Sequence, residues 1–264
     1  MKPQNHKTKG LASNEEWQAW GKVDPRYGVA TKPGRAQDGS NPWTDESFYE
    51  LGAIDWDLFR RKWEQYGLTA GTCVEIGCGA GRMTVHLAGY FELVHGVDVS
   101  AGMLDYARAR MPPNVSLHLT GGLEIPLPDN SADAVFSTHV LQHLSSMDAA
   151  AHYFRQMHRV LRPGGCLMVH VPVIAWPWGS ALGLHKVVHK AKVNLDAWRA
   201  RWLRFRFRRG WADAPPMQIT WYEIGWLYRA FEEMTFEDIE IRILFGGSSM
   251  AVQHPFVFAR KRQA

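Results

Sequence analysis

Residues 72–82, T-C-V-E-I-G-C-G-A-G-R, decide how this 264-residue chain folds. The stretch opens with a short apolar run typical of a buried strand, and a helical pattern follows over residues 79–90. Closely spaced glycines between the two let the backbone turn tightly and approach a ligand. The first turn of the following helix would also present free N–H groups. The stretch therefore predicts a ligand-binding loop between a strand and a helix.

The glycine spacing excludes two common nucleotide-binding loops. A dinucleotide fingerprint, G-x-G-x-x-G, would need glycine where this chain has Arg82, and a P-loop would need a Gly-Lys-Ser/Thr ending. Two acids complete the pattern. Asp98 ends the next apolar run, 21 residues after Gly77, where an acid can accept hydrogen bonds from both hydroxyls of a ribose. Glu75 adds a carboxylate suited to a cationic part of the ligand.

The middle of the chain alternates between apolar runs and helical patterns. Further strands are expected at 92–100, 115–121, 134–141 and 166–172, and helices at 101–111 and 147–161. Such alternation implies parallel strands that are joined by right-handed crossovers and covered on both faces.

The C-terminal part predicts one more helix and two more strands. Residues 220–223 have the pattern of a capping box, which predicts a helix from there to about Met234. The runs 236–245 and 254–262 are joined by a connection too short for a helix, so they should pair antiparallel. The predicted fold class is α/β: a Rossmann-like, doubly wound, seven-stranded sheet, mostly parallel, with an antiparallel C-terminal strand pair.

Composition points to an ordinary globular protein with one unusual segment. Hydrophobic residues make up 46% and charged residues 21%, which argues against a disordered chain. The net charge is +4, yet the segment 185–210 alone carries +8, so the remainder is slightly acidic. Three cysteines are too few for a disulfide framework, and the N-terminus lacks the apolar run of a signal peptide. We therefore expect a cytoplasmic protein and no metal site.

Together, E-x-G-x-G-x-G, the acid after the second strand, and H-R-V-L-R-P-G-G before the fifth strand resemble the class I S-adenosylmethionine-dependent methyltransferases. The similarity is to the small-molecule type, in the ubiquinone-biosynthesis-like subgroup. It covers residues 70–172 well and 219–262 more loosely. The resemblance implies S-adenosyl-L-methionine as cofactor and an N-terminal leader and helix at 1–66. A methyltransferase domain at 67–264 would then carry a substrate-covering insert at 173–218.

The resemblance assigns cofactor contacts to the glycine-rich loop and the strand before it. It implies that Glu75 holds the amino group of the methionine part of the cofactor. The loop residues that it places along the methionine and ribose are Gly77, Cys78, Gly79 and Gly81.

Further implied contacts lie after the second, third and fourth strands. Asp98 would bind the ribose hydroxyls, and Val99 and Met103 would cover the adenine. After the third strand, the family's Asp position holds Gly121, which puts side-chain recognition of the adenine amino group in doubt. Backbone groups near Gly122 or Leu123 would replace it, and Thr138 and His139 would lie beside the methionine part.

A catalytic base is needed only if the acceptor is protonated at neutral pH. His139 and His143 are candidates, because an unperturbed imidazole titrates near pH ~6.5. Equally, both are helix-start residues that backbone groups would satisfy, and His170 fits a structural role at the end of a core strand. The chain lacks the Pro-Pro-aromatic and Pro-Cys motifs of the nucleic-acid methylases in this superfamily. Both departures argue against bases of nucleic acids as acceptors.

The basic segment leaves three interpretations open. It is a lid with solvated arginines, a cap that recognises an anionic or lipid-like acceptor, or an interfacial helix on an anionic membrane or RNA. The leader motif W-G-K-V-D-P-R-Y at 20–27 resembles one that precedes some bacterial small-molecule or glycan-associated methyltransferases. Trp20 and Tyr27 would close over the cofactor or, as we prefer, anchor the leader to the core.

The expected function is methyl transfer to an O or N atom of a small or lipid-like metabolite. One alternative is a scaffold that binds the cofactor without turnover. Another is an RNA or anionic-membrane binder that uses 185–210. The oligomeric state is left open.

Overall fold

The computed structural model describes residues 12–144, 146–174, 220–245 and 253–263. The basic segment 185–210 and nearly all of the expected insert lie outside these residues, so the three interpretations of that segment stay open. The helix expected at 147–161 and the strand that follows it are present, as α6 (Met147–Val160) and β5 (Leu161–His170).

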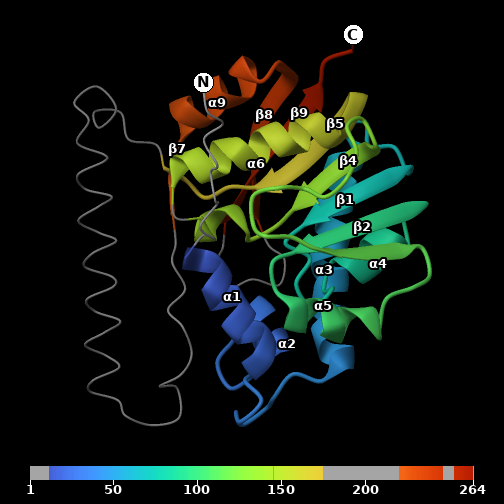
Figure 1. The fold of residues 1–264 in the computed structure, drawn as a ribbon, viewed down its shortest axis with the longest axis vertical. Coiled ribbons are helices and arrows are strands. Elements are labelled where there is room, and N and C mark those ends of the chain that lie inside the picture. The colour runs from blue at the N-terminus through green and yellow to red at the C-terminus, as the bar shows by residue number, and fades with distance from the viewer. Residues whose placement is uncertain (1–11, 145, 175–219, 246–252, 264) are drawn as a thin grey trace, which may run out of the picture.

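A seven-stranded sheet forms the centre of the protein (Figure 1). Its strand order is β3-β2-β1-β4-β5-β9-β8. Strands β3 to β5 pair parallel, while β9 pairs antiparallel with β5 and β8, which confirms the predicted mostly parallel sheet with an antiparallel C-terminal pair. The first four strands have the bounds β1 (Thr72–Ile76), β2 (Leu93–Asp98), β3 (Val115–Leu119) and β4 (Ala132–Ser137). The antiparallel pair is β8 (Phe236–Phe245) and β9 (Gln253–Lys261).

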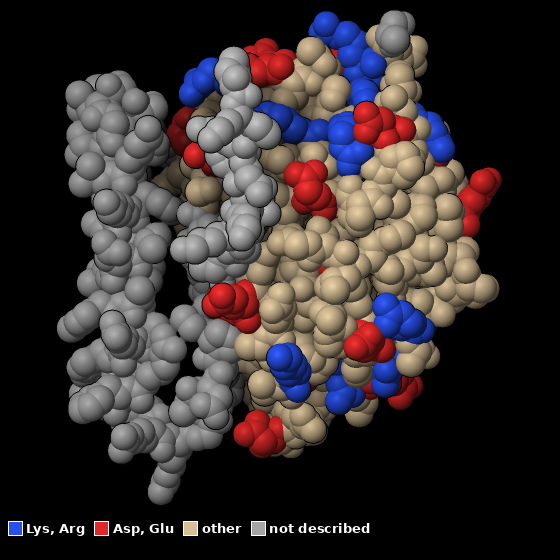
Figure 2. Space-filling view, viewed as in Figure 1, with Lys and Arg blue, Asp and Glu red and all other residues tan. Residues whose placement is uncertain are grey.

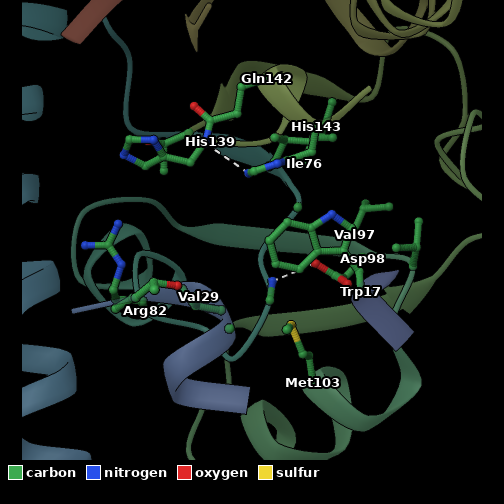
Figure 3. A pocket seen from close by; sticks show the side chains of 18 of the residues that line it. Trp17, Val29, Ile76, Arg82, Val97, Asp98, Met103, His139, Gln142 and His143 are labelled. Carbon is green, nitrogen blue, oxygen red and sulfur yellow. Dashed lines mark hydrogen bonds between the residues drawn. The ribbon is translucent and has the colours of Figure 1, made fainter. Parts of the chain in front are cut away.

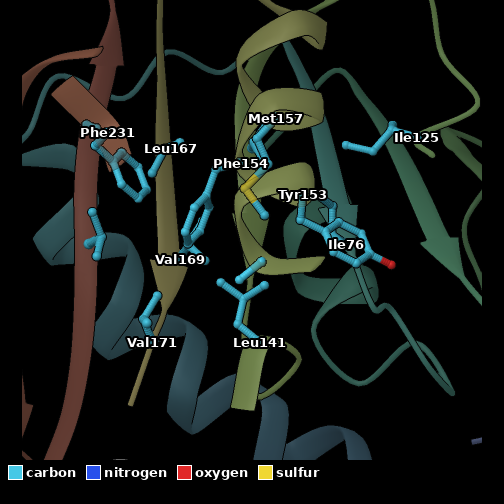
Figure 4. Close-up of a cluster of buried hydrophobic side chains, with 14 of the residues drawn as sticks. Ile76, Ile125, Leu141, Tyr153, Phe154, Met157, Leu167, Val169, Val171 and Phe231 are labelled. Atoms are coloured by element: carbon cyan, nitrogen blue, oxygen red, sulfur yellow. The ribbon is translucent and has the colours of Figure 1, made fainter. Parts of the chain in front are cut away.

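Both faces of the sheet are buried, because alternate residues of each strand point to opposite sides. Val135, Leu167 and Val169 belong to a core cluster beneath α6 and α9 (Ile224–Glu233). In this cluster the ring centroids of Phe154 and Phe231 are 4.6 Å apart (Figure 4). Their neighbours in sequence face a second cluster that is covered by α3 (Asp45–Glu64) and α4 (Thr84–Ala88). This two-sided covering explains why the strands are continuously apolar.

Helix α3 buries a face that carries a charged residue among apolar ones. Phe48, Asp55 and Trp63 lie on this face, whereas Ile54 is 53% exposed. Asp55 is tolerated there because it forms an ion pair with Arg82. A partner far away in sequence thus overrides the hydrophobic pattern.

The start of α9 is also capped differently from the prediction. Glu223 is the N-cap, and its carboxylate accepts hydrogen bonds from the backbone N–H groups of Gly225 and Trp226. Thr220, the expected cap, instead donates its hydroxyl to the carbonyl of Leu144. A short parallel pair that the sequence did not predict, β6 (Val173–Ile174) with β7 (Tyr222–Glu223), fixes the entry to this helix.

The leader packs on the sheet domain. Helices α1 (Ala12–Val23) and α2 (Pro25–Val29) lie beside α5 (Ala101–Arg108). Trp20 and Tyr27 are 5% and 3% exposed and share a cluster with Met103. They anchor the leader, as we preferred from the sequence. The division of the chain at residue 66 stays a prediction.

On the face shown in Figure 2, basic and acidic residues are interspersed around a largely uncharged middle. Within the described ranges, no helix is both long and apolar enough to cross a membrane.

Candidate functional site

A cavity of about 300 Å³ opens at the carboxyl ends of β1, β2 and β4 (Figure 3). Ligands of open α/β sheets bind at this edge, because the loops after the strands meet there. Seven of the predicted cofactor residues line the cavity: Gly77, Gly79, Asp98, Val99, Met103, Thr138 and His139. Both candidate bases line it too, since His143 joins His139 there. The cavity therefore unites the motifs on which the sequence prediction rests.

The glycine-rich loop is held in a conformation that side chains resist. Gly77 has φ +72° and Gly79 has φ +53°. A Cβ at Gly77 would lie 2.1 Å from Val140 Cγ2, so a side chain there would also collide with the cavity wall. The loop therefore needs glycine at this position for both its backbone angle and its close approach.

Asp98 clasps this loop at the end of β2. Its Oδ2 accepts a 2.8 Å hydrogen bond from Gly79 N, and its Oδ1 accepts one of 2.8 Å from Ser100 N. Burial raises the pKa of the carboxyl group, while these N–H groups oppose the rise. Each oxygen keeps lone-pair capacity toward the cavity, as recognition of ribose hydroxyls requires.

Glu75 does not line the cavity. It is 2% exposed, and its Oε2 accepts a 2.6 Å hydrogen bond from the Thr84 hydroxyl. Burial raises the pKa of this carboxyl group to about 7, against the opposing effects of Thr84 and Arg82. Glu75 thus lies behind the wall of the cavity, where its charge rather than a direct contact acts on a ligand.

Four other predicted residues also face away from the cavity. The Cys78 sulfur packs against Gly96, and Gly81 faces Met111. Leu123 packs against the core cluster that contains α6. Gly122 is covered by Asn14, and its carbonyl accepts a hydrogen bond from Tyr153.

The leader supplies cavity residues that the sequence reasoning missed. Asn14 donates a 2.9 Å hydrogen bond to the Gly121 carbonyl, and the ring of Trp17 meets His143 edge-on, 4.9 Å between centroids. Residues 28–32 line the cavity as well. The leader motif gave a signal, since Trp20 and Tyr27 were considered for closing over the cofactor, but Asn14, Trp17 and residues 28–32 were not considered because they lie far from the glycine loop in the chain.

A buried ion pair closes another part of the cavity. Arg82, just after the glycine loop, pairs through Nη1 with Asp55 Oδ2 of α3, and the two side chains are 6% and 4% exposed. Arg82 Nε is buried and has no hydrogen-bond partner among the described residues. Arg82 and Asp55 both line the cavity, although the sequence reasoning used Arg82 only to exclude a dinucleotide loop.

Three histidine rings lie together next to this ion pair. His139 follows β4, His170 ends β5 and His254 lies in β9. The ring centroids of His139 and His170 are 4.5 Å apart. The ring centroid of His254 lies 5.7 Å from that of His139 and 5.9 Å from that of His170. His139 adopts φ +59°, an uncommon angle that turns its ring toward the cavity. Burial, followed by the Arg82 charge, lowers the pKa of His139 to about 3, so its ring is neutral at pH 7.

Fold and site together define a Rossmann-like α/β protein with a cavity at the carboxyl edge of its sheet. Residues 74–169 match the sequence model of a family described as a methyltransferase domain. Over these residues the chain is similar to class I S-adenosylmethionine-dependent methyltransferases of the ubiquinone-biosynthesis-like subgroup.

Proteins of similar sequence or structure are named methyltransferases. A malonyl-[acyl-carrier protein] O-methyltransferase of Yersinia pestis is 39% identical over 38% of this chain and 36% of its own length. A demethylmenaquinone methyltransferase of Tropheryma whipplei is 37% identical over 39% of this chain and 43% of its own length. The chain thus spans less than half the length of either relative. A methyltransferase structure from Thermotoga maritima superposes with TM-score 0.55 at 16% identity, covering 93% of this chain and all of the other.

The family and fold imply S-adenosylmethionine as cofactor, and the residues present fit it. The glycine loop leaves a cradle that a Cβ would fill. Asp98 offers carboxylate oxygens toward the cavity. The Thr138 hydroxyl is buried in the cavity wall and has no hydrogen-bond partner among the described residues, so it is available to a polar ligand.

Proposed function

We propose that this protein transfers a methyl group from S-adenosylmethionine to an oxygen or nitrogen atom of a small or lipid-like metabolite. The observation that carries the proposal is one cavity shared by the Gly79–Asp98 clasp, the unpartnered Thr138 hydroxyl and the two candidate bases. The names of the relatives from Yersinia pestis and Tropheryma whipplei, an acyl-carrier-protein and a menaquinone-related methyltransferase, support a lipid-like acceptor.

When bound, S-adenosylmethionine supplies a methyl group on a cationic sulfur that is already electrophilic. The chain has to hold an acceptor in line with that methyl, and positioning alone can contribute roughly 7–11 kcal/mol. Asp98 and the glycine loop fix the nucleoside end. Trp17 and Asn14, from the leader, line the cavity.

Of the two candidate bases, His139 is better placed to meet an acceptor. The Nε2 atom of His143 lies 2.9 Å from the Gln142 side-chain nitrogen, which donates to it and so occupies its lone pair. The ring of His143 also packs against Trp17. We therefore assign His143 to shaping the cavity and His139 to the acceptor, with the cofactor held by Asp98, Thr138 and the glycine loop.

Location and partners follow from the same features. All three cysteines are buried and unpaired, as is typical of a reducing compartment, which supports a cytoplasmic protein. The partner that we propose is a small-molecule acceptor.

Calorimetry with S-adenosylhomocysteine tests the cofactor site. Wild-type protein should bind, and Asp98→Ala should bind about 10–100-fold more weakly, because it loses hydrogen bonds worth about 1–3 kcal/mol. Asp105→Ala, on the exposed surface of α5, is the matched control and should bind as wild type. No binding at millimolar ligand would refute the proposal. Binding without transfer of labelled methyl into a metabolite extract would identify the scaffold alternative instead.

A further inference from the structure

We infer that the acceptor atom is a negatively charged oxygen, as in a carboxylate, phenolate or enolate, and not an amine nitrogen. The inference rests on the proposed methyl transfer and narrows it. It comes from the part of the cavity formed by the Arg82–Asp55 pair and by His139, with His170 and His254 packed behind His139; we call these five residues the acceptor chamber.

The charges around the cavity favour an anion away from the cofactor clasp. The charged side chains that line it are Lys32, Asp55, Arg82 and Asp98. Asp98 is engaged with the glycine loop, and Asp55 is matched by Arg82. Among the described residues that line the cavity, this leaves one positive charge in excess outside the clasp and, apart from Asp55, which Arg82 neutralises, no carboxylate that could stabilise an ammonium group. A cationic amine entering there would be repelled at low effective dielectric.

Arg82 also offers a hydrogen bond that only some acceptors can use. Its Nε–H is buried, and within the described residues nothing accepts from it. A guanidinium group only donates. An anionic oxygen has several lone pairs, so one can attack the methyl while another accepts from Arg82. An amine nucleophile has a single lone pair, which cannot do both.

The histidines are suited to an acceptor that arrives already ionised. His139 is neutral at pH 7 and a weak proton acceptor, because burial and the Arg82 charge oppose its protonation. His170 is 4% exposed, and its Nδ1 has no hydrogen-bond partner in the described part of the chain. Besides Arg82 and His170, the groups that face His139 are Asp55, His143 and His254. No three or more His, Cys, Asp or Glu side chains of the described residues are arranged to hold a metal ion.

The reaction that this chamber favours needs no base. An oxygen lone pair forms the new O–CH3 bond, the S–CH3 bond breaks with its electron pair left on sulfur, and the two opposite charges cancel. No proton has to leave. Methylation of an amine would instead create an ammonium cation beside Arg82. His139 is poorly able to take the proton from that ammonium group.

The identity of the methylated atom gives the first test. A small-molecule extract is incubated with the protein and S-adenosylmethionine carrying a 13C-labelled methyl group, and the product is examined by NMR. We expect an O-methyl product, and alkaline hydrolysis then separates an ester from an ether. An N-methyl product overturns the inference and leaves the proposed function intact. Absence of any labelled product, with cofactor binding retained, overturns both.

The second test asks whether Arg82 serves the acceptor or the carboxylate of the cofactor. The variant is Asp55→Leu with Arg82→Met, because apolar replacement of both partners of a buried ion pair is often near neutral for stability. Its thermal unfolding is measured alongside. S-adenosylhomocysteine carries the amino-acid part of the cofactor, whereas 5′-methylthioadenosine lacks it.

We expect both ligands to bind this double variant as they bind wild type, while transfer to the O-acceptor falls by about tenfold or more through loss of a charged hydrogen bond. Weaker binding of S-adenosylhomocysteine alone would assign Arg82 to the cofactor carboxylate and overturn the inference. Unchanged transfer would overturn it as well.

Discussion

The two ends of the cavity differ in what builds their walls. The end of the cavity that we assign to the cofactor consists mainly of the glycine-loop backbone and the Asp98 carboxylate, both from residues 77–98, with the Thr138 hydroxyl added after β4. The acceptor chamber consists of side chains from α3, the loop after β1, and the ends of β4, β5 and β9. The difference teaches that the proposed cofactor site is encoded mostly within a short stretch of sequence, whereas the proposed acceptor site is made of residues that only the fold brings together.

The largest effect should come from the cofactor end. Gly77→Ala forces a Cβ onto a backbone with φ +72° and into Val140, so we expect a loss of about 2–4 kcal/mol in unfolding free energy from strain and overpacking. Urea denaturation measures it. Gly121→Ala is the control, because a Cβ there meets nothing within 4 Å among the described residues. Equal losses of unfolding free energy in both variants would show that glycine is not specifically required at position 77.

The next effect concerns the charge of Glu75. Because its pKa is raised to about 7, it gains a proton as the pH falls through 7, and a cationic ligand loses a favourable charge. We expect the affinity for S-adenosylmethionine to fall by up to about tenfold between pH 8 and pH 6. His139 stays neutral over this interval and adds no change of its own. Calorimetry at both pH values measures the change.

Glu75→Gln is the matched control for this dependence. It removes the titrating group and keeps the size of the side chain, so its affinity should stay level between the two pH values. If Glu75→Gln showed the same pH profile as wild type, another group would be responsible for the titration. The pH dependence would then no longer distinguish the cofactor end of the cavity from the acceptor chamber.

The smallest effect should come from the leader. Trp17→Ala removes the ring that packs against His143, a contact worth about 0.5–1.5 kcal/mol. We expect kcat/KM for the acceptor to fall by about 2–10-fold, while binding of 5′-methylthioadenosine stays as in wild type. Trp17→Phe should recover most of the loss. A larger effect on the nucleoside than on the acceptor would move Trp17 to the cofactor end.

Sequence patterns predicted the strands and their mostly parallel pairing, because buried parallel strands leave continuous apolar runs. They failed where a polar contact decides a local structure. No sequence pattern indicated that Asp55 of α3 is buried in an ion pair with Arg82, and Glu223 replaced Thr220 as the cap of α9. Five predicted cofactor residues turned out to lie behind the wall or under the leader, since a motif tells which residues are near a ligand but not which way they point.

The sequence by itself predicted the fold class, the cofactor and the closeness of the glycine loop to Asp98 at one ligand, because the glycines and Asp98 belong to one strand–loop–helix–strand unit. Only the tertiary structure decided that Arg82 meets Asp55, that three histidines from separate strands share one chamber, and that the leader covers the cavity. These contacts join residues far apart in the chain. Burial then sets the pKa of His139 and Glu75, and no pattern in the sequence carries that information.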